Sequence, residues 1–172
     1  MQQAKWFDRK FEFGSTQNIF PSIIERLRGT PARLEEKIRT VSDEFACVKL
    51  NGAWSIKENI GHLIDLEPLW VGRLEDILSK KTELRVADLT NQKTDQANHN
   101  SKTLKDLTQD FRSIRSSTIE KLKKLKEEEI FLSALHPRLK TPMRTMDHFL
   151  FVAEHDDHHL VTINELIQTL NR

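Results

Sequence analysis

The chain is predicted to be all-α, with residues 1–172 forming a single domain built as a four-helix bundle. Only five glycines and five prolines occur in it, and the long stretches between them carry apolar residues at helical rather than alternating spacing. Four such amphipathic stretches, in a chain long enough to bury one core without a second domain, favour a bundle. No internal repeat or low-complexity linker divides the sequence.

The first stretch opens at Phe20-Pro21 and extends to Ile38. Gly29-Thr30-Pro31 interrupts its apolar period, and Thr30 could cap a restart with Pro31 at the first helical position. One kinked helix and two short helices are both consistent with this pattern.

The second stretch is predicted to be one helix from Ile56 to about Leu78. Ser55 and Glu58 have the spacing of a capping box, in which each side chain bonds the other's backbone N–H. Pro68 falls inside the helix and should remove one hydrogen bond and bend the axis.

The second half of the chain contains the other two predicted helices, over residues 103–126 and 145–170, the latter with its first residue as the expected N-cap. Between the second and third helices, residues 79–101 are polar, without an apolar period. They are predicted to form a loop, either a functional cover or a mobile segment. His136-Pro137 and Thr141-Pro142 mark the connection that precedes the last helix.

Composition limits the classes of function. Lys and Arg number 27 against 26 Asp and Glu, a balance that argues against a dedicated nucleic-acid surface. The one cysteine, Cys47, rules out an intramolecular disulfide. No signal peptide is visible and no apolar run is long enough to span a membrane, so a cytoplasmic location and no membrane partner are expected.

Two histidines of the last predicted helix face its apolar side together. His155 and His159 are four residues apart, and so lie one above the other on that face. His148 lies on the same side two turns earlier and is expected in the core, whereas His158 points about 100° away, toward the polar side. The His-x-x-x-His spacing is how a helix offers two imidazoles to one metal ion, although such pairs also occur by chance.

His62 lies at the edge of the apolar face of the second predicted helix. A lone histidine there is more often a satisfied, partly buried side chain than a ligand. Opposite His155 and His159, a metal ligand is favoured, because three neutral imidazoles suit zinc or nickel and burying them without a common partner is costly. We therefore expect these three to bind one divalent metal. One turn away, Glu58 is expected to be only the capping acid, and Asp65 is a candidate hydrogen-bond partner of the ligand.

Three protein ligands leave a coordination position free, which is typical of a reactive rather than a structural site. Cys47 could in principle be a fourth ligand, but it lies in the first loop between helices. A metalloprotease would carry a glutamate base as His-Glu-x-x-His; here Asp156, Asp157 and His158 intervene, and both aspartates are expected to lie off the core-facing arc. No catalytic residue is assigned.

Two segments resemble the DinB/YfiT-like superfamily, particularly its DinB-like branch. Trp54-Ser55-Ile56-Lys57-Glu58-Asn59-Ile60-Gly61-His62-Leu63 is similar to the family's Trp-Ser-x-x-Glu-x-x-x-His-Leu stretch, and Glu154-His155-Asp156-Asp157-His158-His159-Leu160 to its C-terminal His-x-x-x-His helix. Phe111-Arg112-Ser113-Ile114-Arg115 resembles its third helix with a frequent arginine. The sequence departs from the family at the expected rim of the pocket, where a glycine often found near Lys140 is absent.

The resemblance implies a bundle of up-down-down-up connectivity, with His62, His155 and His159 as the metal ligands. Members include transferases and isomerases that use bacillithiol, mycothiol or glutathione, others are classed as metal-dependent hydrolases, and homodimers are common. We therefore expect a homodimeric thiol S-transferase acting on small electrophiles, with residues 79–101 and Arg115 contacting the substrate. The alternatives are a hydrolase using metal-bound water, or a non-enzymatic metal-binding or stress-related module.

Overall fold

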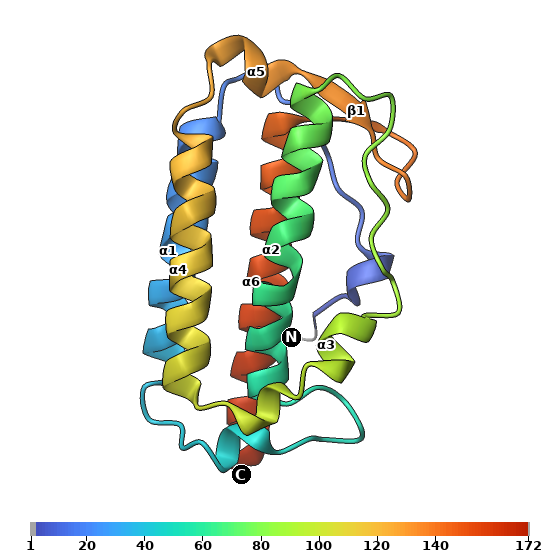
Figure 1. Cartoon of the computed structure of the whole chain (residues 1–172). Coiled ribbons are helices and arrows are strands. Elements are labelled where there is room, and N and C mark those ends of the chain that lie inside the picture. The colour runs from blue at the N-terminus through green and yellow to red at the C-terminus, as the bar shows by residue number, and fades with distance from the viewer. Residues whose placement is uncertain (1–2, 172) are drawn as a thin grey trace.

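The computed structural model describes residues 3–171 and contains four long helices (Figure 1). They are α1 (Phe20–Ile38), α2 (Ile56–Leu78), α4 (Leu104–Leu122) and α6 (Thr145–Leu170). The predicted all-α class and four-helix bundle are confirmed. Within these residues, no helix is both long and apolar enough to cross a membrane.

The four helices run in an up-down-down-up order, as expected. In Figure 1, α1 and α6 descend, whereas α2 and α4 ascend. Each of α2 and α1 contacts both α4 and α6, so the order around the bundle is α1, α4, α2, α6. Because α2 and α4 are parallel neighbours, the connection from residue 79 to residue 103 must return along the whole bundle, a length of about 30 Å at 1.5 Å per helical residue.

α1 is a single continuous helix despite Pro31, which settles the choice between one helix and two. Pro31 has no N–H to donate to the carbonyl oxygen of Leu27, its partner one turn earlier. That oxygen instead accepts a hydrogen bond from Nη1 of Arg115 on α4 at 3.4 Å. A side chain from a neighbouring helix therefore replaces the lost backbone bond.

α2 begins and ends where the sequence predicts. The hydroxyl of Ser55 accepts from the N–H of Glu58 at 3.1 Å, and the Glu58 carboxylate accepts from the N–H of Ser55 at 2.9 Å. The capping box is thus formed, and the preferred role of Glu58 as the capping acid is confirmed. Pro68 is accommodated within the helix.

The connections contain more regular structure than the sequence indicates. They include α3 (Gln92–Gln96), α5 (Glu127–Phe131), an antiparallel hairpin of β1 (Ser133–Leu135) with β2 (Pro142–Arg144), and short 3-10 turns at Trp6–Asp8, Phe45–Cys47 and His99–Ser101. The predicted third helix was too long, since α4 ends at Leu122. The predicted N-cap of the last helix was also wrong by one residue. Thr145 is the first helical residue, and its hydroxyl donates to the Glu129 carbonyl at 2.8 Å.

A buried ionic layer divides the hydrophobic core into two halves. Arg115 of α4 lies at its centre and is paired with Glu67 of α2 and Asp156 of α6. Thr30 of α1 donates to Asp156 at 2.9 Å, so all four long helices contribute to the layer. Burial alone would lower the pKa of Arg115, but the two carboxylates outweigh it and hold that pKa above its ordinary value. Removing Arg115 would leave two buried carboxylates without their cationic partner.

Candidate metal centre

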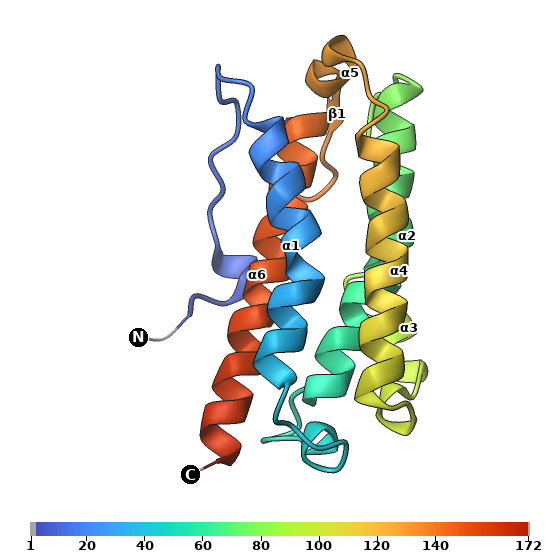
Figure 2. The same ribbon diagram turned by 90° about the vertical axis from the view of Figure 1, so that its left-hand side faces the viewer.

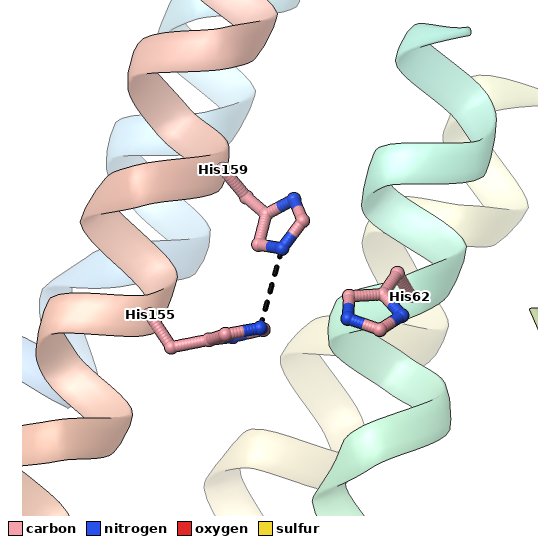
Figure 3. A group of neighbouring side chains, drawn as sticks. All are labelled: His62, His155 and His159. Carbon is pink, nitrogen blue, oxygen red and sulfur yellow. Dashed lines mark hydrogen bonds between the residues drawn. The ribbon is translucent and has the colours of Figure 1, made fainter. Parts of the chain in front are cut away.

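Three buried histidines from two helices meet inside the bundle (Figure 3). His155 and His159 extend from α6 toward His62 of α2, and one ring nitrogen of each lies within 4.8 Å of the others. Their exposed fractions are 4% for His62, 4% for His155 and 7% for His159. The structure therefore brings together the three histidines that the sequence singled out.

An amide side chain orients His159. Nδ2 of Asn59 donates to the carbonyl oxygens of Ser55 at 2.8 Å and of Trp54 at 3.3 Å, which turns Oδ1 of Asn59 toward the imidazole. Nδ1 of His159 lies 2.8 Å from that oxygen and must carry the proton. Nε2 of His159 is therefore unprotonated and faces Nε2 of His155 at 3.3 Å.

A second polar chain orients His62. The hydroxyl of Thr94 donates to Oδ2 of Asp65 at 3.0 Å and therefore accepts from Nδ1–H of His62, also at 3.0 Å. His99 contacts the same Asp65 oxygen through Nε2 at 2.8 Å. Asp65 thus acts on His62 through Thr94, and Nε2 of His62 is left free to bind a metal ion.

All three imidazoles are neutral near pH 7. Burial lowers the pKa of His62 to about 4. Burial also holds the pKa values of His155 and His159 well below the ordinary range, and the neighbouring imidazoles lower them further. Neutral imidazole is the form that binds metal, so no proton has to be displaced at this pH.

The donor set fits a divalent metal ion. Because Nδ1 of His159 is protonated, its Nε2 carries a lone pair. If the proton of His155 is on Nδ1, the two Nε2 atoms face each other with lone pairs; if it is on Nε2, that N–H donates to His159. Nδ1 of His155 is buried without a hydrogen-bond partner among residues 3–171, so the structure fixes no tautomer for this ring. At tetrahedral zinc, with Zn–N bonds of about 2.0–2.1 Å, neighbouring ligand nitrogens lie about 3.3 Å apart. The α6 pair already has this separation.

The triad forms part of the wall of a cavity of about 720 Å³. Trp54 lies beside it, with ring centroids 4.6 Å from His62 and 6.3 Å from His159. Trp6 packs edge-on against His155 at 5.0 Å. The surroundings of the free nitrogens are therefore mainly aromatic.

Several segments outside the long helices cover this cavity, among them the N-terminal segment and the connection between α2 and α4. The N-terminal segment lies along α6 (Figure 2), where Arg9 is ion-paired with Glu154 and Trp6 contacts Phe151. Residues 86–89 and Asn91, from the connection between α2 and α4, contribute further lining. Of the two alternatives for the polar loop, a functional cover and a mobile segment, this placement favours the cover.

The family model of the DinB superfamily matches residues 26–163. The chain belongs to the DinB superfamily. Among solved structures, this DinB-superfamily chain is similar to YfiT from Bacillus subtilis, with a TM-score of 0.76 and 17% sequence identity over 95% of this chain and 94% of that one. YfiT is described as a probable metal-dependent hydrolase with an unusual four-helix bundle topology. A search of the curated proteins found no match.

Several expectations about residues near the DinB triad can be compared with the structure. His148 is fully buried, as expected, with Nε2 3.0 Å from the carbonyl oxygen of Trp70. The expected substrate contact of Arg115 is wrong, because this arginine is enclosed by the ionic layer. The expectation that Asp156 lies off the core-facing arc is also wrong, since that residue is fully buried. Cys47 contacts backbone carbonyls and is not a member of the histidine group.

Sequence reasoning missed the side chains that orient the DinB histidines from other elements. Asn59 could have been found, since it is three residues before His62 on the same helix. Thr94 and His99 belong to a polar connection whose path the sequence does not reveal. Lys140 has φ of 51°, a left-handed conformation that glycine adopts without cost, which accounts for the glycine expected nearby.

Proposed function

We propose that this chain is a metal-dependent enzyme that transfers a low-molecular-weight thiol to small electrophiles. His62, His155 and His159 would hold one divalent ion, zinc or nickel, and the aromatic cavity beside them would hold both reactants. The observation that carries the proposal is a buried triad of neutral imidazoles, oriented by Asn59 and Thr94, in the wall of a cavity of about 720 Å³.

The metal would supply one effect, the lowering of the pKa of a thiol bound at the open position. The thiol sulfur then forms a bond to the electrophilic carbon, the bond from that carbon to its leaving group breaks, and the thiol proton passes to solvent. Trp6 and Trp54 would pack on the reactants and exclude water, and sulfur makes favourable contacts with aromatic rings.

The surroundings of the triad suit this reaction better than hydrolysis. A thiolate needs no protein base once formed, whereas attack by water is usually assisted by a carboxylate. Within residues 3–171, no carboxylate joins the three histidines at ligand distance. The nearest acid in the hydrogen-bond chain, Asp65, lies behind Thr94.

A hydrolase is the second candidate, and one observation favours it. His158 lines the cavity, and burial, with Arg9 nearby, lowers its pKa, so its imidazole is neutral near pH 7 and could accept a proton from water. The description of YfiT points in the same direction, although its likeness at 17% identity concerns the fold.

Metal analysis of the purified protein is the first test. We expect one equivalent of zinc or nickel per chain, abolished in His155→Ala and largely retained in the matched variant His158→Ala. If neither ion binds stoichiometrically to the wild-type chain, both enzymatic candidates fail. The reverse pattern in the two variants would refute the assignment of His155 as the ligand.

Turnover distinguishes the two candidates. The metal-loaded protein would be incubated with bacillithiol or glutathione and 1-chloro-2,4-dinitrobenzene, and separately with a panel of p-nitrophenyl esters. Thioether formation that requires His155 supports the transferase, and ester cleavage that requires both His155 and His158 supports the hydrolase. If a stoichiometric metal is bound but neither thioether formation nor ester cleavage is detected, the non-enzymatic module is favoured. Light scattering would test the expected homodimer.

A further inference from the structure

The cavity extends along α2 well beyond the histidine triad. Arg73 follows His62 by eleven residues, which at 100° per residue returns to nearly the same face of the helix. The two Cα atoms are therefore about 16 Å apart along the axis. Both side chains line the same cavity, so a ligand that occupies it can approach the triad at one end and Arg73 at the other.

Arg73 is a buried cation without an acidic partner. Its exposed fraction is 2%, and no carboxylate among residues 3–171 forms an ion pair with it. The nearby acid, Asp76, is engaged by Arg85 and Lys81 instead. Burial, with Arg138 nearby, lowers the pKa of Arg73 to about 10, so it remains charged near pH 7. A buried guanidinium normally has an acidic partner, as Arg115 has here.

His136 presents a hydrogen-bond donor to Arg73, which is also a donor. Its Nδ1 accepts from the N–H groups of Arg138 at 3.2 Å and Leu139 at 3.1 Å, which places the proton of the neutral ring on Nε2. That Nε2 lies 3.1 Å from Nη1 of Arg73, which is also a donor. The opposite tautomer would satisfy this contact but set Nδ1–H against two backbone N–H groups. Burial, then Arg73 and Arg138, lower the pKa of His136 to about 4, so the ring is neutral.

The other charged groups at this end leave an excess of positive charge. Arg138 has no ion pair among the described residues, and its guanidinium lies over the ring of Phe7 at 5.2 Å. Lys140 is paired with Glu83 at 3.3 Å. The second lining carboxylate, Asp88, accepts instead from groups of its own loop, including the N–H of Thr90 at 2.9 Å. Neither acid therefore serves Arg73 or His136.

We propose that Arg73 and His136 form an oxyanion-binding subsite, and that the ligand of this cavity is an elongated molecule with a terminal carboxylate or phosphate. An oxygen of such a group placed between Nη1 of Arg73 and Nε2 of His136 accepts from both donors and neutralises the guanidinium. The identity of the reacting end, next to the triad, rests on the proposed function, whereas the anion subsite does not.

Binding to the metal-free protein tests the subsite directly. The probes are 4-phenylbutyrate and its uncharged counterpart 4-phenylbutanamide, followed through the fluorescence of Trp6, Trp54 and Trp70, all of which line the cavity. We expect the acid to bind at least about tenfold more tightly than the amide, the effect of one hydrogen-bonded charge. Phenyl phosphate, compared with the acid, then distinguishes a phosphate ligand from a carboxylate ligand, and tighter binding of either supports the subsite.

Matched variants assign the preference to its residues. Arg73→Gln should abolish it. His136→Asn should reduce it while keeping the fold, because the asparagine oxygen can replace Nδ1 as acceptor for the backbone but no donor faces Arg73. Arg112→Gln, which removes an exposed arginine paired with Glu35, is the charge-matched control and should leave the preference unchanged.

Equal binding of acid and amide to the wild-type protein would overturn the proposal, as would a preference that survives in both Arg73→Gln and His136→Asn. The result is separable from the proposed function, because all of these variants should still bind one metal ion at the triad. Anion preference without turnover would keep the subsite and reject the transferase. Thiol transfer without anion preference would do the opposite.

Discussion

Thr94→Val is the sharpest test of how the triad is held. Valine keeps the shape of threonine but removes the hydroxyl that accepts from Nδ1–H of His62 and donates to Asp65, both at 3.0 Å. Thr94 is 3% exposed, so water cannot readily take the place of the lost group. Nδ1–H of His62 is then left without an acceptor, and its ring loses the contact that fixes its orientation.

The expected magnitude follows from these two losses. A buried donor left unsatisfied costs about 1–3 kcal/mol in the free energy of unfolding. Loss of a hydrogen-bond partner of a metal-binding histidine lowers metal affinity about 10- to 100-fold. That factor corresponds to about 1.4–2.7 kcal/mol in the free energy of binding.

Competition for zinc against a chromophoric chelator measures the change in affinity, and thermal unfolding of the metal-free protein measures the change in stability. Thr145→Val is the matched control, since it removes an equally buried hydroxyl at the start of α6 that donates to the backbone carbonyl of Glu129. It should lower stability and leave zinc affinity unchanged. Zinc affinity of Thr94→Val within twofold of wild type would refute the role given to this hydroxyl.

Three further predictions concern pH, packing and metal removal. Burial lowers the pKa of His148 to about 3, so folding resists its protonation, and stability should fall by about 1.4 kcal/mol per pH unit below pH 6.5. The difference in unfolding free energy between wild type and His148→Gln, measured by urea titration from pH 7.5 to 4, should show this slope; parallel curves would contradict it. A Cβ at Gly61 would lie 2.2 Å from the ring of His99, which is held by its carboxylate partner, so Gly61→Ala should cost about 1–3 kcal/mol. Gly72→Ala meets the end of the exposed side chain of Arg85, which is paired with Asp76 but is flexible enough to shift, so this change should cost less in the same titration. A chelator should lower the Tm by about 5–10 °C if metal is present at a hundred times its Kd, and should have no effect on His155→Ala in calorimetry.

The helices and the triad were accessible from the sequence because both depend on local spacing. Apolar periodicity and the Ser55–Glu58 capping box placed α2 within a residue of its observed bounds. The four-residue spacing of His155 and His159 fixed their common face. His62 needed the resemblance in addition, because spacing within one helix does not reveal which helix lies opposite.

The ionic layer was not accessible, because it depends on pairing across helices. Asp156 was expected off the core-facing arc, since a carboxylate counts as polar in any periodicity. It is buried because Arg115 and Thr30 supply its hydrogen bonds from two other helices. The carbonyl of Leu27, left free by Pro31, helps to place the same arginine. Periodicity assigns each residue to a face without knowledge of such partners.

The connection between α2 and α4 contributes to the cavity in two ways. Residues 86–89 and Asn91 form part of its lining, and Thr94, a few residues later, is hydrogen-bonded to the imidazole of His62. Because α2 and α4 are parallel, this connection has to travel the length of the bundle, and here it does so beside the cavity. A ligand large enough to displace this connection would therefore strain the hydrogen bond between Thr94 and His62. We then expect a metal ion bound by the triad to exchange fastest while a ligand enters or leaves the cavity.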